Sequence, residues 1–360
     1  MKRLVALIGA IKLLWLGFRI KGDFKILQVK EYSEGVLIAL PKNDDTKNFG
    51  RQSLFWDSRA GHALVEPLQI QPDEDKVWFR VERIFRGELR PKKSAWLSGW
   101  LGEMPEDFNL SNYEIVRLPN QTQALHFEGR EDVWAIHVHG RKATFGEALR
   151  NARQFSELSF SQLFMSMESD DRPWGLAKFK SKLGSTEWKQ VEMAVQFAKS
   201  KGAKSIVLFG WSMGAMLIGQ FLRNSNEKHQ ISGVVFDSPL LDYVGTLKLQ
   251  SKLAGYSEEV GEVAASAIVK SKTLKMCGFD NIDINKLSLL NGPIGTNVPI
   301  LCLYSKNDGF IDMSGVEHFA QLNPNVKLTE IAGARHCRLF NQDQQKYQKS
   351  IATWIQALGI

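Results

Sequence analysis

The sequence has few cysteines, and their spacing excludes two classes of protein. Only Cys277, Cys302 and Cys337 occur in 360 residues, far apart along the chain. Three scattered cysteines make neither the disulfide framework of a small secreted domain nor a four-ligand zinc site. An odd, sparse count suits a reducing compartment, so we expect a cytoplasmic location.

The chain also lacks an uninterrupted apolar run long enough to cross a membrane. Its most apolar stretch, residues 4–18, contains Lys12 and is shorter than the roughly 20 residues that a spanning helix needs. No small-residue cleavage site follows, as a signal peptide would require. We therefore expect residues 1–22 to form an apolar and basic N-terminal helix. Two alternatives stay open for it: association with a membrane, lying on the surface or as an uncleaved anchor, and packing on the protein's own surface.

Charge is not strongly in excess of either sign. Lys and Arg number 46 against 39 Asp and Glu, which gives a net charge of +7, and basic residues are concentrated only at 80–93. No nucleic-acid-binding signature accompanies them, so no nucleic-acid partner is expected, and a solvated surface is the default interpretation. The sharper alternative is attraction to anionic lipid or acidic substrates. The sequence does not predict an oligomeric state.

Hydrophobic patterning divides the rest of the chain into two parts. The hydrophobic content of 44% is ample for one large core and a smaller one. Residues 23–105 alternate apolar and polar side chains, which predicts a small β-rich N-terminal module. Residues 106–360 alternate strand and helix patterns, which predicts an α/β fold with a doubly wound, mostly parallel sheet. Within it, residues 243–296 read as a helical insertion that would form a lid. The other predicted elements are antiparallel strands at 112–118 and 123–127, helices at about 145–158 and 186–201, and a strand at 159–165.

The most informative motif is Gly210-Trp211-Ser212-Met213-Gly214. It follows the apolar, β-leaning residues 205–209 and precedes the helix-like residues 215–222. Strand, G-x-S-x-G, helix is the context of a nucleophile elbow, a sharp turn that exposes a serine hydroxyl above the sheet. Gly210 and Gly214 fit this turn because side chains there would collide with the neighbouring strand and helix. Ser212 is therefore the candidate nucleophile.

A serine hydroxyl needs a base and a group that orients the base. His336 lies in a small-residue loop after the apolar residues 328–331, and Asp308 lies in a polar turn after another apolar strand. Both follow Ser212 in the order expected for this type of site. Residues beyond the carboxyl ends of parallel strands gather at one edge of a sheet, so the three could meet. Asp237, which ends a further apolar strand, is the alternative acid.

A fourth element could bind the oxygen that becomes negative during acyl transfer. The apolar strand 133–138 ends in His139-Gly140-Arg141. Preorganised N–H groups aimed at this oxygen usually contribute most to such catalysis. We expect the backbone N–H groups of Met213 and Arg141 to supply them, with His139 and Gly140 supporting the loop. A metal bound by His137 and His139 would need further ligands, and no cluster at suitable spacing offers them, so no metal or cofactor is expected.

Together these motifs resemble a serine hydrolase of the α/β-hydrolase superfamily. More narrowly, the chain is similar to a bacterial group marked by His139-Gly140-Arg141-x-Ala143-Thr144, Glu147-Ala148-Leu149-Arg150, Leu183-Gly184-x-Thr186-Glu187-Trp188 and Gly210-Trp211-Ser212-Met213-Gly214. The resemblance implies the α/β-hydrolase fold and serine-dependent hydrolysis, but no particular substrate. The chain departs from the group at Ala215, where another glycine is usual, and at residues 164–171, where a Tyr-Arg-Asn-Asp run is usual.

The predicted reaction is hydrolysis of a carboxylic ester or thioester through an acyl-enzyme on Ser212. The partner would be a small-molecule acyl substrate. Two alternatives stay open: a serine peptidase or aminopeptidase of the same fold, and a hydrolase-like protein that binds without catalysis. The pentapeptide motif is shared by esterases, lipases, peptidases and thioesterases, so the sequence does not choose the acyl group or the bond that is cleaved.

Overall fold

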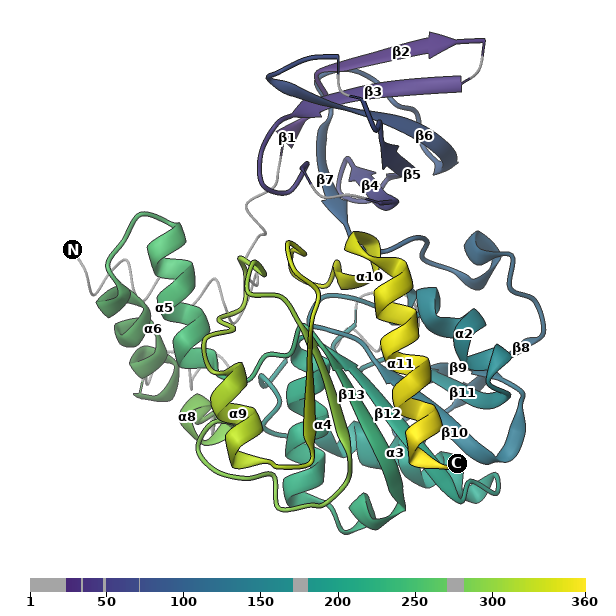
Figure 1. The fold of residues 1–360 in the computed structure, drawn as a ribbon, viewed down its shortest axis with the longest axis vertical. Helices are drawn as coiled ribbons and strands as arrows, with labels where there is room; N and C mark the ends of the chain where they lie inside the picture. The colour runs from purple at the N-terminus through teal and green to yellow at the C-terminus, as the bar shows by residue number, and fades with distance from the viewer. Residues whose placement is uncertain (1–23, 34, 48–49, 71, 171–180, 271–281) are drawn as a thin grey trace.

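The computed structural model describes residues 24–33, 35–47, 50–70, 72–170, 181–270 and 282–360, which form two β-sheets, one above the other in Figure 1. The predicted N-terminal helix at 1–22, Cys277 and the 271–281 part of the predicted lid lie outside these residues. Within the described ranges, no helix is both long enough and apolar enough to cross a membrane.

The smaller sheet is built from the N-terminal part of the chain. Its seven strands are β1 (Phe24–Lys25), β2 (Gln28–Tyr32), β3 (Gly35–Pro41), β4 (Gln52–Trp56), β5 (Gly61–Pro67), β6 (Lys76–Arg86) and β7 (Ser94–Ser98), in the order β1-β7-β4-β5-β6-β3-β2. Neighbouring strands are antiparallel. Apolar side chains of alternate positions, such as Leu54, Val65 and Phe79, form a core of their own. We call residues 24–98 the β module.

The larger sheet has eight strands. These are β8 (Tyr113–Arg117), β9 (Gln123–Phe127), β10 (Arg130–Val138), β11 (Phe160–Met165), β12 (Ser205–Trp211), β13 (Ile231–Asp237), β14 (Ile300–Tyr304) and β15 (Val326–Glu330), in the order β15-β14-β13-β12-β10-β11-β9-β8. Pairing is parallel from β15 to β11 and antiparallel for β9 and β8. The sheet is therefore mostly parallel, with the two antiparallel strands at one edge.

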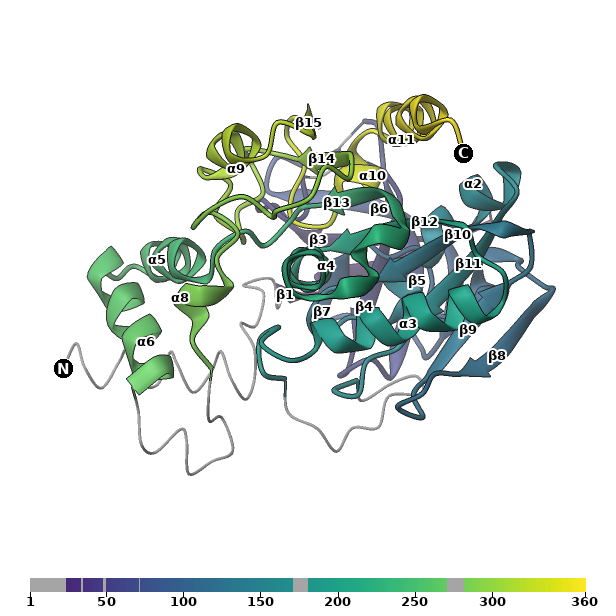
Figure 2. The ribbon, with the colours of Figure 1, turned by 90° about the horizontal axis from the view of Figure 1, so that it is seen from below.

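Helices cover both faces of this sheet, as Figure 2 shows. On one face, α3 (Trp188–Ser200) and α4 (Met213–Asn224) pack on Trp134 and Ile136 of β10. On the other face, α2 (Ala152–Glu157) and α11 (Gln344–Leu358) belong to the core that contains Val133 and Ala135. Successive side chains of a strand point to opposite faces, so a strand buried on both faces is apolar along its length.

The region predicted as one helix at about 145–158 is different in the structure. It consists of two short 3₁₀ helices, Phe145–Glu147 and Leu149–Asn151, and only then α2. Thr144 caps the first of them by accepting a hydrogen bond from the N–H of Gly146. The side chain of Glu147 is turned back to the N–H of Gly140, 2.8 Å away. The chain thus forms tight turns where Glu147 contacts Gly140, and it becomes α-helical only after that contact.

In the described residues between β13 and β14 there are three helices. They are α5 (Tyr243–Leu253), α6 (Glu258–Lys270) and α8 (Ile284–Leu287), and they lie beyond one edge of the sheet in Figure 1. A further helix, α9 (Val316–Leu322), lies between β14 and β15, and α10 (Leu339–Gln342) precedes α11. The helical character expected at 243–296 is present in the described residues. That these helices act as a lid stays a prediction.

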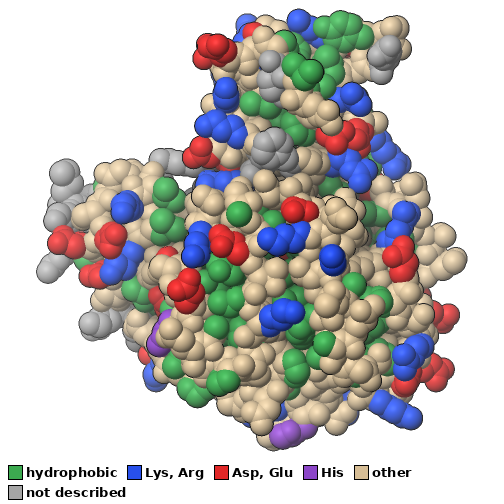
Figure 3. All heavy atoms as spheres, viewed as in Figure 1, with side chains coloured by type: hydrophobic (Ala, Val, Ile, Leu, Met, Phe, Trp, Pro, Cys, Tyr) green, Lys and Arg blue, Asp and Glu red, His purple; other side chains and the backbone are tan. Residues whose placement is uncertain are grey.

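Charged side chains of both signs gather where the β module meets the larger part of the molecule (Figure 3). Arg86 forms an ion pair with Glu103, and Arg83 donates to the carbonyl oxygen of Asp107 at 3.4 Å. Residues 80–93, expected as solvated surface, thus include two arginines that contact the segment joining the sheets. These contacts join the β module to the larger part of the molecule through polar groups.

Helix α4 approaches β10 too closely for a side chain at Gly214. A Cβ atom there would lie 2.1 Å from the carbonyl oxygen of Val138, which is backbone inside the sheet and cannot move aside. Gly219, one and a half turns later, offers a contrast. A Cβ there would lie 2.6 Å from the Cδ1 atom of Leu289, the end of a flexible side chain.

We expect Gly214→Ala to lower the free energy of unfolding by about 3 kcal/mol or more, because overpacking against rigid backbone is costly. Gly219→Ala should change it by less than about 1 kcal/mol, since Leu289 can shift and alanine favours the helix. Urea denaturation of both variants measures the difference. Equal losses in the two variants would contradict the close approach at Gly214.

Candidate active site

Ser212 lies in the sharp turn between β12 and α4. Its backbone has φ 50° and ψ −114°, an unusual conformation for a residue other than glycine. Three backbone hydrogen bonds of Ser212 hold the turn. Its N–H donates to the carbonyl of Asp237 at 3.0 Å, and its carbonyl accepts from the N–H groups of Ala215 and Leu240, both at 3.1 Å. The side chain lies at the start of α4, where backbone N–H groups have no partner within the helix. The residue is only 8% exposed.

His336 and Asp308 come to Ser212 from two other loops. The Nε2 atom of His336 is 3.0 Å from the Oγ atom of Ser212, and its Nδ1 atom is 2.8 Å from Oδ2 of Asp308. The other carboxylate oxygen of Asp308 accepts from the N–H groups of Phe310 and Ile311, at 3.0 and 2.7 Å. The carboxylate is thus held by backbone on one side and faces the imidazole on the other. Hydroxyl, imidazole and carboxylate form one continuous hydrogen-bonded line.

The pKa of the His336 imidazole is raised above its ordinary value. Burial lowers its pKa, but the charge of Asp308 and the hydrogen bond to it raise it further, so the net pKa lies above the ordinary 6.5. A base with a raised pKa, next to a hydroxyl that it can deprotonate, is the arrangement that general-base chemistry needs.

Asp237, the alternative acid, is engaged elsewhere. Its carboxylate accepts from the hydroxyl groups of Tyr347 and Ser238, at 2.8 and 2.9 Å, and lies 3.5 Å from the guanidinium of Arg150. All of this is fully buried. Of the two acids that follow strands, the structure brings Asp308, and not Asp237, against the imidazole of His336.

The loop at 139–144, between β10 and the first 3₁₀ helix, is held on both sides of Gly140. The N–H of Gly140 donates to Glu147 Oε2 at 2.8 Å, while Nδ1 of His139 lies 2.8 Å from the carbonyl oxygen of Gly140. Nε2 of His139 lies 2.9 Å from Oδ2 of Asp170. Both ring nitrogens face oxygen atoms, an arrangement in which a protonated ring donates to both. Burial lowers the pKa of His139, but Asp170 and the Gly140 carbonyl raise it more.

These contacts fix the orientation of the peptide between Gly140 and Arg141. In a trans peptide the N–H points opposite to the C=O. Because His139 holds the Gly140 carbonyl, the N–H of Arg141 is directed to the other side of the loop. The loop also lies close to the serine, since a Cβ atom on Gly140 would be 3.2 Å from Cβ of Ser212.

His137 plays no part in this arrangement. Its ring stacks on Phe164, with centroids 4.2 Å apart, and burial lowers its pKa to about 3, so it is neutral. It lies on the opposite side of the backbone from a residue such as Val138, in the core that α2 covers. Among the residues that the structure describes, no group of three or more His, Cys, Asp or Glu side chains is arranged to hold a metal ion.

A second serine–histidine pair lies in the β module. The Oγ atom of Ser53 is 2.8 Å from Nε2 of His62, whose ring packs between Phe55 and Phe85. Ser53 and His62 have no exposed surface, and burial with the nearby arginines lowers the pKa of His62 to about 3. No carbonyl substrate can reach this hydroxyl, so the pair is part of the packing.

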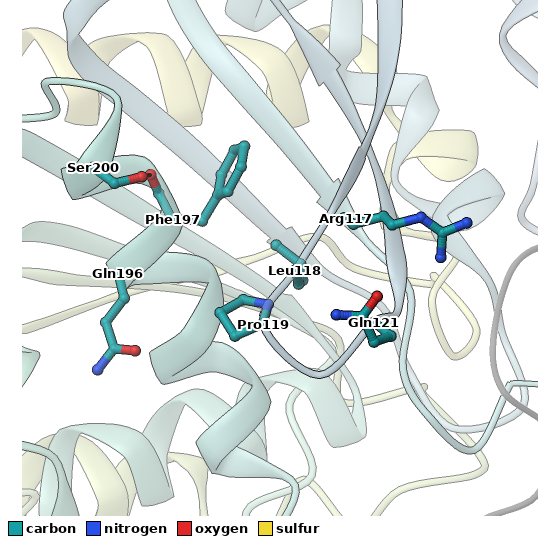
Figure 4. Close-up of a pocket in the computed structure, with 7 residues that line it drawn as sticks. All are labelled: Arg117, Leu118, Pro119, Gln121, Gln196, Phe197 and Ser200. Atoms are coloured by element: carbon teal, nitrogen blue, oxygen red, sulfur yellow. Dashed lines mark hydrogen bonds between the residues drawn. The ribbon is translucent and has the colours of Figure 1, made fainter.

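A separate hollow of about 410 Å³ is drawn in Figure 4. It lies between the turn after β8 and the C-terminal half of α3, and its lining includes Leu118, Pro119 and Phe197. It shares no residue with the Ser212 site. Its side chains offer neither a nucleophile with a base nor a cluster of charges, so it adds nothing to the chemistry.

Sequence patterns did not point to two residues of the site. Glu147 and Asp170 carry the hydrogen bonds that orient the 139–144 loop, and neither is among the candidate site residues predicted from the sequence. Asp170 could have been noticed, because it follows the carboxyl end of β11, and such positions gather at the same edge as Ser212. Glu147 stands in a motif of the resemblance, but its contact with Gly140 was not predictable, because only the 3₁₀ turns bring its side chain back.

Comparisons with known proteins agree with this architecture. Residues 25–98 match a family model described as a domain of unknown function (DUF8805). A comparison with curated proteins gave no match. Among solved structures, the chain is similar to an esterase of Pyrococcus furiosus, at 17% identity and a TM-score of 0.53 over 71% of this chain and 94% of that one. It is also similar to the mouse alpha/beta hydrolase domain-containing protein 10, at 12% identity and a TM-score of 0.51 over 69% and 100%. The chain therefore has the α/β-hydrolase fold.

We expect Asp170→Asn to destabilise the protein more at low pH than at high pH. The folded-state pKa of His139 lies above its ordinary 6.5, so the stabilisation is complete below pH 6.5 and is lost as pH rises through the folded pKa. Breaking a buried ion pair of this kind costs about 3 kcal/mol. Urea denaturation at pH 6 and pH 9 measures this, with Asp132→Asn, from an exposed pair with Arg130, as the control that should change little at either pH. A loss independent of pH would show that His139 is not protonated.

Proposed function

We propose that the protein hydrolyses a carboxylic ester through an acyl-enzyme on Ser212. The observation that carries the proposal is the position of His336, with one ring nitrogen 3.0 Å from Ser212 Oγ and the other 2.8 Å from Asp308. A serine becomes nucleophilic at neutral pH when such a base lies within hydrogen-bond distance and is itself oriented.

In the first half of the reaction, Ser212 Oγ attacks the acyl carbon while His336 Nε2 takes the hydroxyl proton. The carbonyl π electrons move to the oxygen, which becomes negative. The backbone N–H groups of Met213, at the start of α4, and Arg141, in the oriented peptide, are the proposed donors to that oxygen. Asp308 stabilises the imidazolium. The oxyanion then collapses, and the C–O bond to the leaving alcohol breaks as His336 returns the proton to it.

In the second half, water replaces the alcohol. His336 takes a proton from the water, whose oxygen attacks the acyl carbon, and the oxyanion forms again at the same donors. Collapse breaks the bond to Ser212 Oγ, and His336 gives the proton back to the serine. The products are a carboxylic acid and an alcohol, and the enzyme returns to its starting state.

Ser212→Ala should reduce kcat for hydrolysis of p-nitrophenyl esters by about 10⁴-fold or more, because the nucleophile is lost. The measurement uses acyl chains from acetyl to palmitoyl, with Ser200→Ala, an exposed serine at the end of α3, as the matched control. An optimum in chain length sizes the acyl-binding region. Equal activity in wild type and Ser212→Ala would refute the mechanism, whereas serine-dependent cleavage of peptide amides without ester cleavage would move the assignment to a peptidase.

Asp308→Asn should lower kcat by about 10⁴-fold and move the acidic limb of the pH profile to lower pH. The neutral imidazole is the active form of His336, so activity falls as pH drops through its raised pKa. Removing the Asp308 charge removes the main cause of that raised pKa. The profile of kcat/KM against pH reports this limb. Asp312→Asn, in the same loop, is the control, and an unshifted limb in Asp308→Asn would argue against Asp308 as the partner of His336.

A further inference from the structure

The loop that carries His336 rests on the β module. We call residues 331–338, between β15 and α10, the histidine loop. Arg338, two residues beyond His336, is only 4% exposed. Its guanidinium donates to the carbonyl oxygens of Asp45 and Leu97, both at 2.9 Å. Leu97 pairs with Leu54 inside the small sheet, so this acceptor is fixed by the module's own hydrogen bonds.

Cys337, directly after His336, is held from the same side. Its φ of 54° lies in the left-handed region, where a residue other than glycine needs support. Its carbonyl accepts from Arg150 at 2.9 Å, and the same Arg150 nitrogen donates to the carbonyl of Gly99 at 3.1 Å. A Cβ atom on Gly99 would lie 2.3 Å from the Cys337 oxygen. The chain leaving the β module thus runs against the backbone of the histidine loop.

The 139–144 loop is in contact with the same region. Trp100 and Ala143 belong to one small apolar cluster with Phe55 of β4. Arg59, at the β4–β5 turn, stacks over Trp100, with its guanidinium carbon 4.9 Å from the ring centroid. Its Nη2 atom donates to the carbonyl oxygen of Lys142 at 3.5 Å. Two of the loops that form the Ser212 site are therefore supported by the β module or the segment that leaves it.

We propose that the β module holds the histidine loop in the position that catalysis requires, with Arg338 as the positioning residue. The inference rests on the proposed function. A connecting loop moves unless it is anchored, whereas a base must be held within about 0.5 Å of its working position. Arg338 supplies the anchor, because its two donors join the loop to two separate carbonyl groups on the module side. A domain of otherwise undefined role thereby becomes part of the catalytic apparatus.

The test compares Arg338→Gln with Arg338→Lys and with Arg83→Gln. Arg83 also joins the β module to the rest of the chain, but through Asp107, away from the histidine loop. We expect Arg338→Gln to lower kcat by about 10- to 100-fold with little change in KM, since a displaced base slows chemistry more than binding. Arg338→Lys, which keeps the charge but has a single donor nitrogen in place of two, should fall between wild type and Arg338→Gln. Arg83→Gln should retain wild-type kcat. Thermal denaturation of each variant shows that it is folded at the assay temperature.

A second readout is independent of turnover. The proton on His336 Nδ1, shared with Asp308, should give a resolved downfield signal in the proton NMR spectrum of the full-length protein. This signal should weaken in Arg338→Gln and persist in Arg83→Gln. Wild-type kcat and an unchanged signal in folded Arg338→Gln would overturn the inference, as would equal losses in Arg338→Gln and Arg83→Gln. If Arg338→Gln does not fold, Arg338→Lys decides in the same way.

Failure of the proposed function is distinguishable from failure of this inference. Wild-type protein without Ser212-dependent hydrolysis would overturn the proposed function, and the NMR signal would still report whether the loop depends on Arg338. Active wild type with an unaffected Arg338→Gln variant would leave the proposed function intact and overturn the positioning role.

Discussion

The guanidinium of Arg150 is buried where three parts of the molecule meet. It contacts the carbonyl of Gly99 at the exit of the β module, the carbonyl of Cys337 in the histidine loop and the carboxylate of Asp237 at the end of β13. Burial of an ion costs several kcal/mol unless its hydrogen bonds are satisfied, so each of these acceptors must remain in place. The backbone next to the imidazole of His336 is therefore held by a buried cation.

The parts of the fold that follow from local chemistry were predictable from the sequence. Strands buried on both faces are uniformly apolar, and a serine between glycines at a strand–helix junction marks a sharp turn. The α/β-hydrolase fold was confirmed by the solved structures of similar architecture. The prediction of one helix at 145–158 was wrong for its first half. There the contact of Glu147 with the Gly140 N–H overrides the helical pattern.

Contacts between distant residues were not predictable in this way. Asp237 and Asp308 have the same pattern, a carboxylate after an apolar strand, and only their surroundings separate them. The hydroxyl of Tyr347, 110 residues after Asp237 in sequence, donates to the carboxylate of Asp237. The imidazole of His336 faces the carboxylate of Asp308. The two carbonyl groups that accept from Arg338 were not predictable either, because every residue has a backbone oxygen whatever its side chain. The catalytic roles of Ser212, His336 and Asp308, and of the Met213 and Arg141 N–H groups, stay predictions.

Two loops adjoining Ser212 each carry an imidazole, that of His336 and that of His139, and the surroundings of the two rings differ. His336 has a hydroxyl on one side, which can give or take a proton, so under the proposed mechanism it changes charge in each turnover. His139 faces a carboxylate and a carbonyl, neither of which has a proton to give, so its charge stays constant while that of His336 alternates. Under that mechanism a turnover moves a proton on one imidazole, although two are present.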